Sequence, residues 1–318
     1  MGKQAAPPQL ANLCVFGWTL ASVLEHPRAN NGPRTLHGVE LWAGVGNVHR
    51  ALKKAGNSSK MSDKEALFKP GTVQESDFVE ANIATPSGFT SRLFLVLAIV
   101  PGGLLWQAPD CSSFGFLNMK KTCRSGANPE GDWSYDKVVS GNMQNKIAAF
   151  FFALACLRDI LCVTENPARS LFFQMPDWRL LASYFHMRSA IANRCAFDKS
   201  KVGERLLKEY RLMGLAWVET LGRTCPCQRR GHILLAQTWY DPRDGKMKTT
   251  GDKKRLATSA VYALGFGHWI VQKWSAASPG IAGNASGGGS SQSVSTNWKR
   301  PAHEVELAMG DWKRPRRS

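Results

Sequence analysis

Two periods of apolar residues alternate along residues 37–175, and they predict strands that alternate with helices. Short apolar runs predict strands at residues 37–42, 104–109 and 160–164. Apolar positions three and four residues apart predict helices at residues 47–55, 88–99 and 142–158. Strands that alternate with helices predict a mostly parallel sheet, covered by helices on both faces, with a ligand site at the carboxyl ends of the strands. We therefore expect an α/β fold of the Rossmann type.

The remaining segments have different patterns. Residues 119–141 are polar, basic and rich in glycine, which is typical of a long functional loop. Residues 256–274 are apolar again and predict a helix that closes the domain. The expected parts are an N-terminal extension at 1–34, the Rossmann domain at 35–198, a small basic insert or lobe at 199–254, the closing helix at 255–274, and a disordered Gly/Ser linker with a basic tail at 275–318.

The chain has a large positive net charge, which indicates a negatively charged partner. The formal net charge is +17, whereas hydrophobic residues make up 43% of the sequence, enough for a buried core. Residues 275–297 are uncharged, and residues 298–318 contribute only +3, with six Lys or Arg against three Asp or Glu. The folded part is therefore itself basic, which favours a polyanionic partner, most simply a nucleic acid. A basic protein without such a partner is the alternative.

The cysteines and the basic tail bear on localisation. The eight cysteines are scattered, and Cys156 and Cys162 stand in apolar runs, which favours reduced thiols inside a cell. No apolar run is as long as a membrane span, so we expect no membrane association. The end of the tail, residues 313–317, is compatible equally with nuclear import, with nucleic-acid binding, and with a merely solvated basic end.

A glycine-rich turn follows the first predicted strand. Residues 40–47 read Glu-Leu-Trp-Ala-Gly-Val-Gly-Asn and lie where the strand passes into a helix. Gly44 and Gly46 allow the backbone to approach a ligand closely, and the helix amino terminus directs its N–H groups to the same place. Glu40, four residues before the first glycine, makes the pattern more specific. The alternative is a tight turn without a ligand.

Two further motifs follow strands. Residues 108–114 read Ala-Pro-Asp-Cys-Ser-Ser-Phe, and residues 165–167 read Glu-Asn-Pro. Together with the glycine-rich turn, they resemble the catalytic domain of the carbon-5 cytosine methyltransferases, and most closely the divergent type found in algae and linked to mobile elements. The resemblance covers residues 37–175 and implies a class I, S-adenosylmethionine-dependent methyltransferase fold.

The resemblance also implies roles for individual residues. Cys111 would be the nucleophile that adds to carbon-6 of cytosine, and Glu165, beside Asn166, would be the acid that activates the ring. The base would leave its stack to enter the site, and residues 119–141 would form a lid over it. The residues expected at S-adenosylmethionine are Glu40, Trp42, Gly44, Gly46, Asp63, Asn82 and Pro109, with Asp63 at the ribose hydroxyls.

Two departures from the family pattern leave a rival function open. Asp110 stands where the family has proline, and a neighbouring carboxylate raises the pKa of a thiol. Asn82 stands where the family has an acid. The first hypothesis is a methyltransferase that acts in DNA methylation, or on RNA. The second is a catalytically degenerate protein of mobile-element origin, which binds nucleic acid on the same fold. A third is a domain that serves only within a mobile-element assembly.

A second group of cysteines raises the question of a metal. Cys225 and Cys227 are separated by one residue, His232 follows, and Cys195 lies upstream. This spacing is tighter than that of ordinary structural zinc sites. The sequence alone therefore predicts no metal site.

Overall fold

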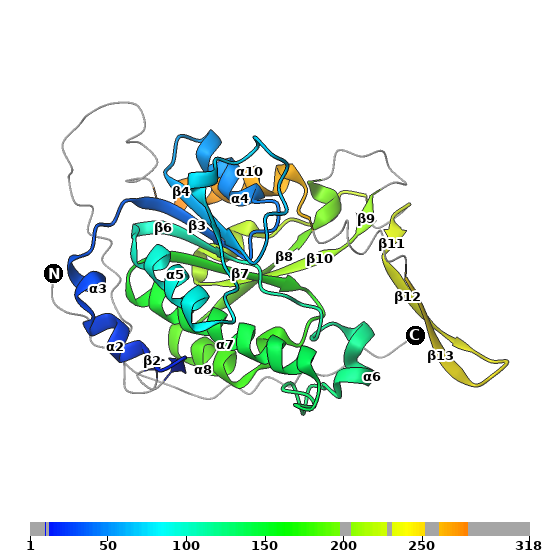
Figure 1. Ribbon diagram of the computed structural model, residues 1–318. Coiled ribbons are helices and arrows are strands. Elements are labelled where there is room, and N and C mark those ends of the chain that lie inside the picture. Colours follow the sequence, from blue (N-terminus) through cyan, green and yellow to red (C-terminus); the bar gives the residue numbers. More distant parts are fainter. Residues whose placement is uncertain (1–9, 11–12, 198–204, 228–230, 252–260, 279–318) are drawn as a thin grey trace. The chain divides into compact units, whose positions relative to one another are not determined.

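The computed structural model describes residue 10 and residues 13–197, 205–227, 231–251 and 261–278 (Figure 1). The predicted linker and tail from residue 279 onward lie outside the described residues, as do residues 1–9 of the N-terminal extension. The division into domains as a whole therefore stays a prediction. Within the described residues, no helix combines the length and the apolar character needed to cross a membrane.

A seven-stranded sheet forms the centre of the fold. Its order is β5-β4-β3-β6-β7-β10-β8, and only β10 runs against its neighbours. The first five strands have the 3-2-1-4-5 order of a doubly wound sheet. The strands are β3 (Leu36–Leu41), β4 (Ser59–Asp63), β5 (Phe78–Glu80), β6 (Ile99–Gln107), β7 (Leu161–Pro167), β8 (Arg188–Asn193) and β10 (Glu209–Gly214). This mostly parallel sheet confirms the expected Rossmann-like α/β architecture.

Helices cover both faces of the sheet, as Figure 1 shows. One face carries α4 (Asn47–Lys54) and α10 (Leu264–Ala277), which pack against each other. Its core is aromatic and includes Trp106, Tyr210, Tyr262, Phe266 and Trp274. The other face carries α5 (Pro86–Leu97), α7 (Asp136–Leu157) and α8 (Pro176–Phe185). A second core lies there, with Phe89, Phe150, Phe151, Phe172 and Trp178 among its members.

Some boundaries differ from those expected. The predicted loop at 119–141 contains α6 (Met119–Thr122) and the first turns of α7, so the expectation of a continuous loop is wrong. Because the amino-terminal turns of α7 are polar, apolar spacing missed them. Strand β7 continues through Glu165-Asn166-Pro167, which we expected just beyond the strand.

The predicted insert at 199–254 contributes a strand to the main sheet. Within β10 the residues Tyr210, Leu212 and Gly214 are buried and alternate with partly exposed positions. This period of two places one side of the strand against the core. The sheet therefore extends past residue 198, the expected end of the Rossmann domain.

The remaining elements are short. At the N-terminal end, β1 (Cys14–Val15), β2 (Trp18–Thr19), α2 (Leu20–Glu25) and α3 (Pro27–Asn31) precede the sheet, and β1 and α2 contact α7. After β8 come β9 (Leu206–Leu207), β11 (Ile233–Leu234) and the hairpin of β12 (Ala236–Asp241) and β13 (Lys246–Gly251). The 3₁₀ turns are η1 (Glu75–Asp77), η2 (Phe116–Asn118), η3 (Phe172–Gln174), η4 (Arg194–Ala196) and η5 (Ala216–Leu221). All eight cysteines are free thiols.

Candidate functional site

One cavity of about 630 Å³ opens at the carboxyl ends of the parallel strands. Seven of the ten predicted site residues line it: Trp42, Gly44, Asp63, Asn82, Pro109, Cys111 and Glu165. They come from the ends of β3, β4, β6 and β7 and from the segment after β5, so residues far apart in the sequence share one wall. Glu40, Gly46 and Asn166 are not among its lining residues.

The turn after β3 gives the cavity its first wall. Trp42, Gly44 and Gly46 all have positive φ, at 55°, 55° and 69°. This conformation is unfavourable for a bulky residue such as Trp42 and is natural for glycine. The indole Nε1 of Trp42 donates to Gln144 Oε1 at 2.9 Å, and the Gly44 N–H donates to Asp63 Oδ2 at 2.8 Å. Two side-chain contacts thus hold the strained turn against the cavity.

Gly46 has a packing role in this turn. A Cβ atom there would lie 2.4 Å from Sδ of the buried Met61, whereas a Cβ on Gly44 would meet nothing within 4 Å. Gly46 also precedes the first residue of α4. The structure therefore requires glycine at position 46 whether or not a ligand binds, and leaves open space beside Gly44.

Glu40 does not face the cavity. It is fully buried, and its Oε2 accepts the N–H of His49 at 2.6 Å in the first turns of α4. Burial raises the pKa of Glu40 to about 8, against the opposing effect of the N–H groups of His49 and Val48. The structure thus gives this carboxyl group a place at the amino end of the helix, where it satisfies an otherwise unpaired donor.

The far end of the cavity combines an amide with a buried cation. Asn82 Oδ1 accepts the N–H of Ala84 at 3.0 Å, so one acceptor position of its carbonyl is already used. Arg92 lines the same region although it is only 1% exposed. Its guanidinium donates to the carbonyls of Ala81 and Gly88, while its Nε has no partner among the described residues. Arg92 was not predicted, because no motif in the sequence of α5 marks it as part of a ligand site.

At the opposite end, Asp110 organises the loop that carries Cys111. Its Oδ1 accepts the Ser112 N–H at 2.8 Å, and its Oδ2 accepts the Ser112 hydroxyl at 2.7 Å. A side chain that accepts from the backbone two residues later fixes a tight turn. Asp110 therefore replaces the conformational restriction of a proline with a pair of hydrogen bonds.

The electrostatics of Cys111 depend mainly on burial. The pKa of this thiol is raised to about 11, mainly by burial, and the nearby carboxyl groups of Glu165 and Asp110 contribute smaller increases, in that order. Lys208 opposes them. Asp110 was expected to raise this pKa, and it does so, although burial and Glu165 both have larger effects.

Glu165 lies at the same end, and burial shifts it toward the protonated form. Burial raises its pKa, while Lys208 and the Tyr262 hydroxyl lower it. Tyr262 donates its O–H to Glu165 Oε2 at 2.5 Å, whereas Oε1 has no partner among the described residues. Asn166, next in the chain, points its Nδ2 to the Pro109 carbonyl at 3.2 Å. Asn166 thus joins β7 to the Cys111 loop and does not line the cavity.

Three residues of this end were absent from the sequence-based prediction. Gln144 contacts both the Trp42 indole and, at 3.4 Å, the Asp110 N–H. Lys208 acts on Cys111 and Glu165 through its charge, and Tyr262 holds Glu165. Lys208 and Tyr262 come from segments more than 40 residues downstream of Glu165, and no local pattern marked them. Only the insertion of β10 beside β7 brings Lys208 there.

The segment predicted as a lid is fastened to the Cys111 loop. Arg124 is buried and donates to Ser113 Oγ at 3.1 Å, and its guanidinium lies 3.9 Å from the centre of the Phe114 ring. A cation over an aromatic face is attractive. These contacts join residues 119–141 to the loop that bears the thiol.

Comparison with known proteins gives matches among solved structures. The chain is similar to the Dnmt2 methyltransferase of S. pombe, with 14% identity and a TM-score of 0.33 over 57% of this chain and 49% of that chain. It is also similar to a mutant of Spodoptera frugiperda DNMT2, with 19% identity and a TM-score of 0.33 over 62% of this chain and 54% of that chain. The chain thus spans about half the length of these proteins. No protein-family model and no curated protein matches it.

Proposed function

We propose that the protein is an S-adenosylmethionine-dependent methyltransferase that acts on carbon-5 of cytosine in a nucleic acid, DNA before RNA. The observation that supports it is that Cys111 and Glu165 face the same cavity as the glycine-rich turn after β3. A methyl donor and an activated base must meet in one space for transfer to occur. The basic charge of the chain suits a polyanionic substrate.

The residues at one end of the cavity fit the methyl donor. S-adenosylmethionine supplies an electrophilic methyl group on a sulfonium. Asp63 stands at the end of β4, where a carboxylate can accept from ribose hydroxyls. Trp42 offers an apolar ring, and Gly44 leaves space for close approach. Asn82 and Pro109 complete this end, while the strained turn keeps the backbone in place.

The residues at the other end fit the activation of a pyrimidine ring. The Cys111 thiolate adds to carbon-6 while Glu165 gives its proton to the ring nitrogen, so that carbon-5 gains the electron density needed to take up the methyl group. The carbon-5 proton is then lost to solvent and the sulfur–carbon-6 bond breaks, while the ring nitrogen returns its proton to Glu165, which restores the aromatic ring and the thiolate. Burial raises the pKa of Glu165, which favours the protonated form that this role needs. Because Oε2 already accepts from Tyr262, the proton is placed on Oε1, the oxygen without a partner among the described residues.

The burial of Cys111 favours one alternative, a degenerate protein that binds nucleic acid without turnover. A thiol with a pKa of about 11 is almost fully protonated at neutral pH. For catalysis, the proton must leave when substrate enters, and Lys208 is the cation that favours the thiolate.

A 5-fluorocytosine substrate tests the proposal. The fluorine cannot leave carbon-5 as a proton does, so an active enzyme remains covalently bound through Cys111. Full-length protein is incubated with S-adenosylmethionine and 5-fluorocytosine-containing DNA or RNA pools, and the adduct is located by peptide mass spectrometry. We expect an adduct at Cys111 that requires the cofactor. If both nucleic acids and the cofactor bind but no adduct forms, the degenerate alternative holds.

A further inference from the structure

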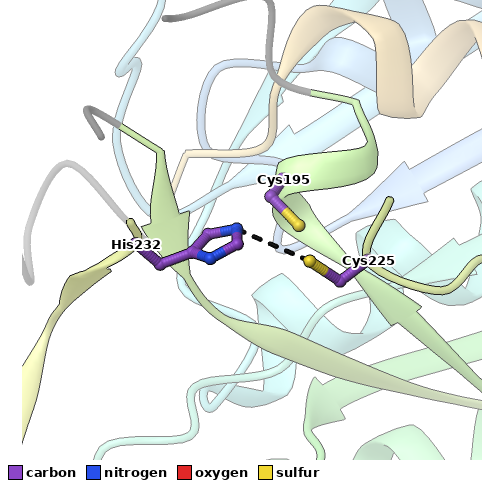
Figure 2. Close-up of side chains that lie close together, drawn as sticks. All are labelled: Cys195, Cys225 and His232. Carbon is purple, nitrogen blue, oxygen red and sulfur yellow. Dashed lines mark hydrogen bonds between the residues drawn. The ribbon is translucent and has the colours of Figure 1, made fainter. Parts of the chain in front are cut away.

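Three possible metal ligands, none of which lines the cavity, lie close together, as Figure 2 shows. They are Cys195 in η4, Cys225 in the segment after η5, and His232 just before β11. Their ligand atoms all lie within 4.8 Å of one another, and Cys225 Sγ lies 3.6 Å from His232 Nε2. A tetrahedral zinc ion with ordinary bond lengths separates a cysteine sulfur from a histidine nitrogen by about 3.6 Å. The spacing of this pair is thus already that of a zinc site.

We propose that Cys195, Cys225 and His232 bind a structural Zn²⁺ ion, with Cys227 as the fourth ligand. Thiolate and imidazole together are the donors that zinc prefers. Cys227 is close enough to Cys195 to interact with it electrostatically, and its Sγ accepts from Arg205 Nη1 at 3.0 Å. The Cys227 side chain leaves Arg205 to reach the metal. On binding, the three thiols release their protons to solvent and the imidazole ligates in its neutral form.

The backbone holds two of these ligands together independently of a metal. The Cys225 N–H donates to Asn193 Oδ1 at 2.8 Å, and the Asn193 N–H donates to the Arg223 carbonyl at 2.9 Å. Cys195 lies two residues after Asn193, and Cys225 lies two residues after Arg223. The site is therefore largely formed before binding, which reduces the entropy lost when a metal is taken up.

The His232 ring contacts Cys225 Sγ through Nε2 and leaves its other nitrogen, the buried Nδ1, without a partner among the described residues. The chain around it is held by the parallel pairing of Ile233 with Leu206, but this pairing does not orient the ring. Coordination of Nε2 would orient it and would join β11 to the end of β8. The sequence spacing suggested no metal because two of the ligands lie outside the Cys-x-Cys pair.

Zinc content of the full-length protein tests the site. Protein purified under reducing conditions is measured by elemental analysis and by native mass spectrometry. We expect one zinc per chain, lost in Cys225→Ser and in His232→Ala and retained in Cys123→Ser, which alters an exposed thiol elsewhere. Circular dichroism verifies that each variant folds. Replacement of the buried Cys195 can disturb packing, so the test uses Cys225 and His232, which are half-buried.

Cobalt gives a second readout that does not depend on the metal retained in purification. Co²⁺ added to the metal-free protein should produce the charge-transfer absorption of a thiolate–cobalt bond, and Zn²⁺ should abolish it. The Cys227→Ser variant should show a weaker band. Absence of zinc in the wild-type protein together with absence of the cobalt band overturns the site, as does a Cys195–Cys225 disulfide under reducing conditions. An unchanged band in Cys227→Ser overturns the fourth ligand alone.

Discussion

The two ends of the cavity are built on different principles. At the end formed by Trp42, Gly44 and Asp63, positive backbone angles and two hydrogen bonds fix the shape of a turn. At the end formed by Cys111, Glu165 and Tyr262, buried titratable groups determine which protons are held. A larger side chain should therefore disrupt the end formed by Trp42, Gly44 and Asp63, whereas a change of charge should disrupt the end formed by Cys111, Glu165 and Tyr262.

The largest expected effect is the loss of the nucleophile. Cys111→Ser should reduce adduct formation with 5-fluorocytosine by at least about a thousandfold, because a hydroxyl is far less nucleophilic than a thiolate. Binding of S-adenosylmethionine, measured by calorimetry, should remain unchanged. Cys123→Ser, at an exposed thiol, serves as the matched control. An equal loss of cofactor affinity would show that the two ends are not separable.

Added bulk at the first end should have the next largest effect. Gly46→Val combines a positive φ with a clash against Met61, so the free energy of unfolding should fall by about 2–4 kcal/mol. The shift in melting temperature on adding cofactor should also disappear. Gly44→Ala has the positive φ without the clash, so its free energy of unfolding should fall by only about 1 kcal/mol. Equal losses in denaturant unfolding would contradict the packing role of Gly46.

The rate at which Cys111 is alkylated should depend on pH in a way that tests the second end of the cavity. Because burial raises the pKa of this thiol to about 11, alkylation by iodoacetamide should accelerate about tenfold per pH unit from pH 7 toward 11. Lys208→Met should shift this curve to higher pH, since Lys208 favours the thiolate. The rate at Cys111 is followed by peptide mass spectrometry, with the denatured protein as reference. A plateau near pH 9 in the folded protein would contradict the burial effect.

The same shift has a consequence for stability. A thiol whose pKa is higher in the folded state contributes stability that is complete below the unfolded pKa, near 9. That contribution is lost as the pH rises toward about 11.

The smallest expected effect is at Asp110. Asp110→Asn keeps an oxygen for the Ser112 N–H but removes the charge, so adduct formation should accelerate by less than about tenfold. Asp110→Pro removes both hydrogen bonds to Ser112, and should gain less than the asparagine variant. Adduct rates at one pH separate the two. A slower asparagine variant would show that the carboxylate has a direct role.

The sequence predicted the parts of the site that depend on local order. Each predicted motif lies at the end of a parallel strand, so the sheet collects Gly44, Cys111 and Glu165 at one edge without further information. Glu40 is not among the lining residues, and its spacing from the glycines is the same whether its carboxyl faces a ligand or caps α4. The burial that distinguishes these possibilities exists only in the folded chain.

What the sequence missed depends on contacts between distant segments. Lys208 and Tyr262 reach their places through the antiparallel strand β10 and the packing around α10. Cys225 and His232 reach Cys195 through the contact with Asn193 and the pairing of β11 with β9. The sequence of β10 does alternate between polar residues and residues that prove to be buried. One short alternating segment among polar residues is too weak a pattern to predict a strand. Long-range pairing is not encoded in a local window, so spacing rules alone gave no metal site.

The order in which the chain is synthesised gives α10 a particular importance. Asn47, at the start of α4, donates from Nδ2 to the Tyr262 carbonyl at 2.7 Å, and Gly267 packs against the Asn47 backbone. The aromatic face of the sheet therefore remains uncovered until residues 264–277 emerge from the ribosome. Nascent chains that end earlier expose Trp106 and Tyr210 to solvent, which favours aggregation or chaperone binding. The last described helix thus sets the earliest moment at which the domain can complete its folding during translation.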